Sequence, residues 1–209
     1  MYIEFIDLLR CPRPHEDSWL VAAFDTMHGR FVVRGSLGCP VCGSRYAIID
    51  GIAMLTDNDP PTGQAPGVDA ARGDDAEEAA RAAAMLSLAQ PGALVVLSGD
   101  SCRLASALSE LAGARVLALN PAVAIDETEG VAVLRCDGVI PIAPRAADGL
   151  MLGNSNLDVL SGASGVLRTG GRLVLPAGTP LAPGFQLLAN DDRYVVSERI
   201  ADLVSLSRQ

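Results

Sequence analysis

Short apolar runs recur along the second part of the chain, separated by loops and by one helix-like segment. They lie at residues 93–97, 115–120, 131–137, 149–153 and 171–176. Runs of this length that alternate with helices are typical of strands buried on both faces of a parallel sheet. The helical pattern of residues 101–112 fits between the first two runs. The pattern therefore predicts a doubly wound α/β region.

Two other parts of the chain predict antiparallel strands. Near the C-terminal end, apolar segments flank the polar turn 190–192, which indicates a hairpin. Near the N-terminal end, the runs 19–24, 30–34 and 44–49 predict a small β-ribbon. A ribbon of roughly 55 residues is too small to be stable without help. A metal ion would supply that help.

The segment between these two parts has no apolar periodicity. Residues 56–75 are rich in Pro, Gly and Asp, which is typical of a solvated linker. Asp75 and Glu78 form a capping-box-like start to an Ala-rich helix that runs to about Leu88. The sequence thus predicts three parts. They are a β-rich domain at 1–55, an acidic linker at 56–75 and an α/β domain at 76–209.

The charge distribution limits the partners that the chain can bind. The chain has a net charge of −9 and contains no Lys. Residues 56–90 carry two Arg and seven acidic residues, so the acidity is concentrated between two more nearly neutral parts. No basic patch is available for phosphates, and we therefore expect no direct nucleic-acid binding.

The apolar pattern also bears on location. No apolar stretch reaches 18 residues, which argues against a membrane span. The first residues, MYIEFIDLLRCP, lack the basic region of a signal peptide. We therefore expect a cytoplasmic protein, with a protein partner or a second copy of the chain as its binding partner.

Two of the five cysteines have the spacing of a metal knuckle. Cys39 and Cys42 lie in a C-P-x-C-G turn that leads into strand-like sequence. A redox CxxC is the alternative interpretation, although such motifs normally open a helix. In a reducing compartment, Cys102 and Cys136, which stand in apolar surroundings, are expected to be buried hydrophobic residues.

A tetrahedral zinc site needs four ligands, and the knuckle supplies two. The segment LLRCPRPH provides Cys11 and, four positions later, His15. His28 is the other candidate, but its turn lies at the far end of the predicted hairpin from Cys11. The predicted zinc ligands are therefore Cys11, His15, Cys39 and Cys42.

The N-terminal part resembles the zinc-ribbon family of the small activator subunit of tRNA and ribosomal methyltransferases. The resemblance rests on LLRCP at 8–12 and GCPVCGSRYAIIDGIAML at 38–55. The chain departs from the family at Pro14, which replaces a cysteine, and at Ala47 and Ala53, which replace prolines. Members that have lost cysteines can keep the fold without metal, so a metal-free ribbon is the alternative to a zinc site.

The C-terminal part resembles the Rossmann-like S-adenosylmethionine-dependent methyltransferases. ALVVLSGDSCRLASAL takes the place of their first strand, glycine loop and helix, and the hairpin at 190–192 takes the place of their closing hairpin. The resemblance implies an α/β fold of this type and places Gly99, Asn120 and Asp137 at the S-adenosylmethionine site. The glycine loop keeps one glycine, and Asn120 replaces the acid that binds the ribose.

These departures lead to three hypotheses about function. The first is a methyltransferase-like protein with a degenerate cofactor loop that acts by protein association. The second is an active S-adenosylmethionine-dependent methyltransferase with a divergent site and a built-in activator ribbon. The third is a zinc-stabilised structural module. No catalytic residue is assigned, although Asn154, Ser155 and Asn156 occupy a position where that family places such residues. Both histidines lie in the ribbon, and without Lys there is no Walker loop, so hydrolase and nucleotidase chemistry is not expected.

Overall fold

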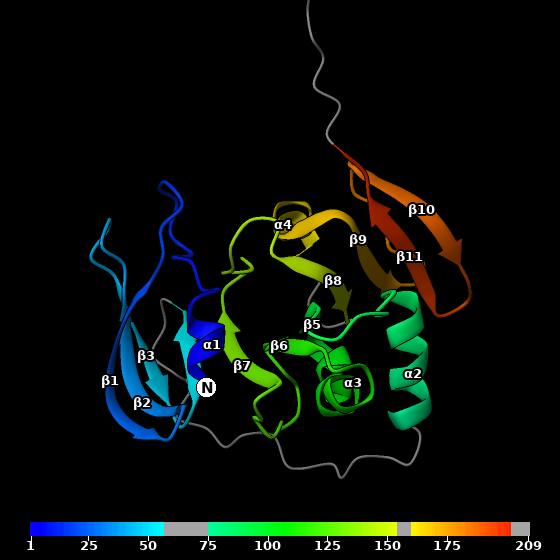
Figure 1. Cartoon of the computed structure of the whole chain (residues 1–209). Coiled ribbons are helices and arrows are strands. Elements are labelled where there is room, and N and C mark those ends of the chain that lie inside the picture. Colours follow the sequence, from blue (N-terminus) through cyan, green and yellow to red (C-terminus); the bar gives the residue numbers. More distant parts are fainter. Residues whose placement is uncertain (57–74, 154–159, 202–209) are drawn as a thin grey trace, which may run out of the picture.

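The computed structural model describes residues 1–56, 75–153 and 160–201, and its elements are shown in Figure 1. The helices are α1 (Ile3–Ile6), α2 (Asp75–Met85), the 3₁₀ helix η1 (Gly99–Leu104), α3 (Ala105–Ala112) and α4 (Leu160–Val166). The strands are β1 (Val21–His28), β2 (Phe31–Gly38), β3 (Arg45–Ile49), β4 (Ile52–Leu55), β5 (Leu94–Ser98), β6 (Arg115–Leu119), β7 (Val131–Cys136), β8 (Ala147–Leu152), β9 (Leu167–Pro176), β10 (Phe185–Asn190) and β11 (Tyr194–Arg199). These described strands form one sheet with the order β1-β2-β3-β4-β7-β6-β5-β8-β9-β11-β10.

Strands β1 to β4 form an antiparallel ribbon, as the sequence predicts for this part of the chain. The alternation in β3 explains its orientation, because Tyr46 and Ile48 are buried while Arg45 and Ala47 are exposed. The sequence pattern did not separate β4 from β3. A turn at Asp50 and Gly51, both with positive φ, divides the alternating run into two strands.

The ribbon is joined to the rest of the sheet by a parallel strand pair. Strand β4 pairs with β7, with Ala53 opposite Leu134 and Leu55 opposite Cys136. The sheet is therefore continuous across the boundary that the sequence predicts after residue 55. The predicted linker lies outside the described residues except at its ends. The pairing with β7 gives the small ribbon a structural support that the sequence pattern did not reveal.

The larger part of the sheet has the α/β arrangement that the sequence predicts. Strands β7, β6, β5, β8 and β9 are parallel, and β11 and β10 close the sheet in antiparallel order. All five residues of β5 are buried, because both of its faces are covered. The chain thus has a Rossmann-like α/β sheet, and Figure 1 shows the ribbon and the β10–β11 hairpin at its opposite ends.

Two local predictions differ from the structure. The helix expected at 101–112 begins two residues earlier as η1, and it becomes an α-helix only at Ala105. The strand expected at 171–176 begins at Leu167, directly after α4. The hairpin around residues 190–192 is confirmed.

The two faces of the sheet are covered differently. On one face, a continuous core runs from the ribbon to the closing hairpin, and α1 and α4 pack on it. On the other face, α2, η1 and α3 pack on the α/β part, and the ribbon contributes to this core only Ile52, at its border. Among the described residues, no helix has both the length and the apolar character needed to cross a bilayer.

Candidate functional sites

The structure brings together the four side chains that the sequence predicts as zinc ligands. Cys39 follows β2 and opens a turn in which its N–H donates to the carbonyl of Ser44 and its carbonyl accepts from the N–H of Gly43. This turn places Cys42 beside Cys39, whereas Cys11 and His15 come from the segment before β1. The Sγ and imidazole nitrogen atoms of the four side chains all lie within 4.8 Å of one another.

Two of the distances in this cluster are close to those of a tetrahedral zinc site. The Sγ atoms of Cys11 and Cys42 are 3.7 Å apart, and Cys39 Sγ lies 3.4 Å from His15 Nε2. Tetrahedral zinc with ordinary bond lengths would separate such atoms by roughly 3.5–3.8 Å. His15 Nδ1 lies 2.5 Å from the carbonyl oxygen of Glu16. A hydrogen bond there would leave Nε2 as the metal-binding nitrogen.

Neighbouring groups change the acidity of this cluster. Hydrogen bonds with the side chain and backbone of Ser44 lower the pKa of the exposed Cys42 thiol to about 6. Burial, together with the Cys11 thiol 3.4 Å from its hydroxyl, raises the pKa of Tyr46 to about 12. Ser44 and Tyr46 were not anticipated as neighbours of the thiols. A thiolate form of Cys42 at neutral pH is the form that binds zinc.

The remaining cysteines and histidine lie apart from this cluster. Cys102 and Cys136 are buried, as the sequence predicts, and burial raises the pKa of each thiol to about 12. His28 is exposed at the end of β1 and is not a member of the cluster. The Cys39–Cys42 motif leads into strand β3 and not into a helix.

The three residues predicted for cofactor binding follow three neighbouring parallel strands. Gly99 follows β5, Asn120 follows β6 and Asp137 follows β7. Because these strands are adjacent and parallel, the three residues lie along one edge of the sheet. Gly99 is buried with φ of 63°, and Asp137 is exposed.

The Asn120 side chain is engaged by the backbone of the next strand. Its Nδ2 donates to the carbonyl of Cys136 at 2.8 Å, and its Oδ1 accepts from the Cys136 N–H at 3.0 Å. Both ends of the amide are therefore used to hold the end of β6 against the end of β7. This use was not evident from the sequence, which suggested only a weak replacement for a ribose-binding acid.

The loop after β5 is closed against the end of β8. Ser101 Oγ lies 2.9 Å from the carbonyl oxygen of Met151, and the Gly153 N–H donates to the carbonyl of Ser98 at 2.8 Å. A Cβ atom on Gly153 would lie only 2.6 Å from the backbone nitrogen of Asp100. Strand order reverses between β5 and β8, which is where ligands of open α/β sheets usually enter. These contacts hold the loop after β5 against the end of β8 at that point.

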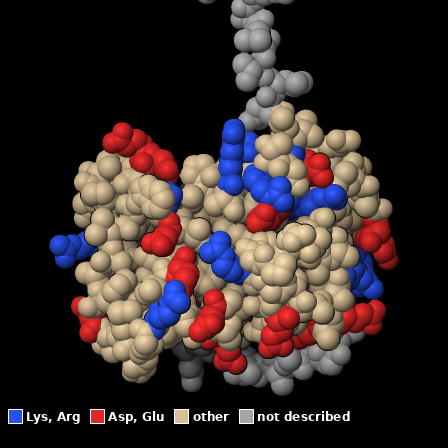
Figure 2. All heavy atoms as spheres, viewed as in Figure 1, with Lys and Arg blue, Asp and Glu red and all other residues tan. Residues whose placement is uncertain are grey.

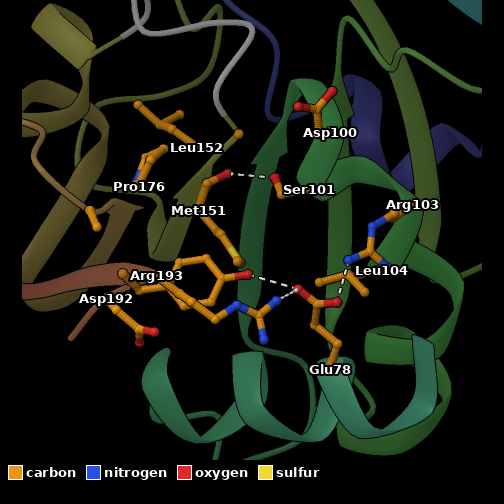
Figure 3. A pocket seen from close by; sticks show the side chains of 13 residues that line it. Glu78, Asp100, Ser101, Arg103, Leu104, Met151, Leu152, Pro176, Asp192 and Arg193 are labelled. Carbon is orange, nitrogen blue, oxygen red and sulfur yellow. Dashed lines mark hydrogen bonds and ion pairs between the residues drawn. The ribbon is translucent and has the colours of Figure 1, made fainter. Parts of the chain in front are cut away.

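A cavity of about 430 Å³ opens at the same place, and Ser101, Met151 and Gly153 are among the residues that line it. Figure 3 shows side chains from η1, the end of β8, α2 and the β10–β11 hairpin around it. Glu78 of α2 is the carboxylate around which the charged groups of the cavity gather. It interacts with the guanidinium groups of Arg103 and Arg193, and it accepts a 2.7 Å hydrogen bond from the Tyr194 hydroxyl. Burial opposes ionisation of Glu78, but Arg103 and Tyr194 outweigh it and hold its pKa below the usual value.

This ionic cluster was not predicted from the sequence. The sequence predicts a helix-capping role for Glu78, and its partners Arg193 and Tyr194 lie more than a hundred positions later. The positions of Asn154, Ser155 and Asn156 lie outside the described residues. Basic side chains stand beside acidic ones across the face shown in Figure 2.

Comparisons with known proteins concern the fold. No protein-family model and no curated protein matches the chain. Solved structures that match include a candidate S-adenosyl-L-methionine-dependent methyltransferase from Methanococcus maripaludis (10% identity, 63% of this chain and 87% of that chain, TM-score 0.46). TrmN from Thermus thermophilus matches at 22% identity over 60% of this chain and 48% of that chain (TM-score 0.42).

A further match is geranyl diphosphate C-methyltransferase from Streptomyces coelicolor A3(2), at 22% identity over 47% of this chain and 45% of that chain (TM-score 0.38). The chain spans 44% to 60% of the length of the first three solved structures that it matches. Likenesses at these identities and scores say nothing about the activity of this chain.

Proposed function

We propose that this chain is a methyltransferase-like protein that acts by association with other proteins and does not bind S-adenosylmethionine tightly. The observation that carries the proposal is the closure of the loop after β5 on the end of β8. The amino-acid part of the cofactor would need space between this loop and β8, and the contacts of Ser101 with Met151 and of Gly153 with Ser98 hold the two together.

The edge of the sheet supports the same conclusion. A ribose needs free acceptors at the end of the second strand of the α/β part. Asn120 is the residue at that position, and both ends of its amide already bond to Cys136. The residues of this edge therefore do not fit the cofactor.

Zinc, in contrast, fits its proposed ligands. Cys11, Cys39 and Cys42 would bind through sulfur and His15 through Nε2, in the tetrahedral set that structural sites use. The ion would hold the segment before β1 to the β2–β3 turn. In this proposal it stabilises the ribbon and takes no part in a reaction.

Calorimetric titration of the zinc-loaded chain with S-adenosylmethionine tests the proposal. We expect a dissociation constant no tighter than about 100 μM, or roughly −5.5 kcal/mol. A cofactor-binding methyltransferase, titrated in the same buffer, is the positive control. Micromolar binding that Asp137→Ala weakens at least tenfold would overturn the proposal, because Asp137 lies on the predicted cofactor edge.

One observation favours an active methyltransferase as the second candidate. The cavity beside Glu78 lies at the carboxyl ends of β5 and β8 and is large enough for a small polar molecule. An enzyme that uses this cavity would require micromolar cofactor binding in the same titration. The two candidates therefore differ in one measurement.

A further inference from the structure

No other element of the described residues covers one face of the ribbon. The strand register places Val21, Gly38 and Arg45 side by side on this face. It places Ala23, Ser36, Ala47 and Met54 in the next row. The residues of this face are called the docking face, and they are Val21, Ala23, Arg34, Ser36, Gly38, Arg45, Ala47 and Met54.

The docking face continues a face that helices cover elsewhere. Met54 is opposite Arg135 of β7, whose neighbour Val133 lies in the core beneath α3. Over the α/β part, this same face is packed by α2 and α3 (Figure 1). Over the ribbon, Val21 is 64% exposed, and Ala23 and Ala47 are also exposed. The sheet therefore has an apolar surface on which no described helix packs.

The shape of the docking face suits one helix. Its central positions are Ala23, Ser36, Gly38 and Ala47, whose side chains are small or absent, so a helix can approach the sheet closely. Four strands spaced about 4.8 Å apart span roughly 14 Å, which is close to the diameter of one helix with its side chains. Val21 and Met54 provide larger apolar groups at the two sides.

The charge of the docking face selects an acidic occupant. Strands β1 to β4 contain Arg34 and Arg45 and one acidic residue, Asp25 of β1, so these strands carry a net positive charge. Both arginines are exposed, and neither forms an ion pair with another described residue. A second copy docked face to face is a poor occupant, because it would place Arg34 and Arg45 against the same two arginines.

We propose that the docking face binds an acidic amphipathic helix of a protein partner. The proposal rests on the proposed function, since it names the surface through which the chain associates. The apolar stripe of the helix packs on the row from Ala23 to Met54, and its flanking Glu or Asp side chains pair with Arg34 and Arg45.

Two synthetic helical peptides of about 20 residues test this proposal. Both carry the same Leu and Ala stripe, but one has Glu flanks and the other has Lys flanks. We expect the zinc-loaded chain to bind the Glu peptide at least tenfold more tightly than the Lys peptide, as measured by fluorescence anisotropy. Ala47→Glu should weaken binding of the Glu peptide at least tenfold. The control Leu111→Glu, at a 59% exposed position on α3, should leave that binding unchanged.

A charge exchange sharpens the test. The double variant Arg34→Glu/Arg45→Glu should prefer the Lys peptide, and circular dichroism should give its native melting temperature. Equal binding of the two peptides by the wild-type chain would overturn the proposal, as would binding that Ala47→Glu does not affect. Self-association that Ala47→Glu abolishes would assign the face to a second copy instead.

The peptide-binding test and the cofactor titration can succeed or fail independently of each other. Peptide binding together with micromolar cofactor binding would overturn the proposed function and leave the docking face supported. Absence of both peptide and cofactor binding would overturn the docking face alone.

Discussion

The ribbon and the α/β part belong to one sheet but are stabilised in different ways. The strands from β7 to β9 are parallel and buried on both faces, so their stability comes from two apolar cores. The ribbon is antiparallel and buried on one face, in a core that it shares with the α/β part, and it joins the rest of the sheet through the β4–β7 pair. The comparison shows that one strand pair can join a small sheet to a large one, so that both share an apolar core.

The largest expected effect concerns the cluster. Cys39→Ser should reduce zinc from about one per chain to less than a tenth and lower the free energy of unfolding by more than about 4 kcal/mol, because metal-binding energy is then folding energy. Elemental analysis and thermal unfolding measure both. Cys102→Ala, outside the cluster, should keep the zinc content. A metal-free wild-type chain would refute the zinc assignment.

A smaller effect is expected at the strand pair that joins the two parts. Leu134 is fully buried in β7 opposite Ala53. Leu134→Ala should destabilise the chain by about 3 kcal/mol through the cavity it leaves. Urea unfolding should then show one transition, shifted for probes in both parts. Leu187→Ala, at a 52% exposed position, should change stability by less than about 0.5 kcal/mol. Two separate transitions in the wild-type chain would mean that the ribbon unfolds independently.

The smallest of these effects concerns Glu78 in the α/β part. Glu78→Gln should cost about 2 kcal/mol at neutral pH, because it removes the charged partner of Arg103 and Arg193. Glu77→Gln is the matched control, since Glu77 is 78% exposed and pairs only with Arg81 among the described residues.

The difference in the free energy of unfolding between the wild-type chain and Glu78→Gln should depend on pH with a definite sign. The pKa of Glu78 is lower in the folded chain than its usual value of 4.5. Its stabilising effect is therefore complete above pH 4.5 and is lost as the pH falls through the folded-state pKa. Denaturant unfolding at several pH values should show the wild-type advantage over Glu78→Gln shrinking in acid. A difference that grows in acid would contradict the assignment.

The features that could be predicted from the sequence are those that depend on local patterns. The buried run at 93–97 identified β5, and the spacing of Cys39 and Cys42 with the earlier Cys11 and His15 identified the cluster. Contacts between distant positions were not predictable in this way. The parallel pairing of β4 with β7 has no signal in either strand. Likewise, the identity of Asn120 does not tell whether its amide binds a ribose or, as here, the backbone of Cys136.

The β4–β7 pair also has a consequence for the order of folding. Ala53 and Leu134 are about 80 residues apart in the chain, whereas β1 to β4 are joined by short turns. Closing a long loop carries a larger entropy cost than closing a hairpin. The ribbon hairpins should therefore form rapidly and dock onto β7 late. During that interval, β4 and β7 are two unpaired strand edges, and a chain newly made at high concentration is exposed to edge-to-edge aggregation.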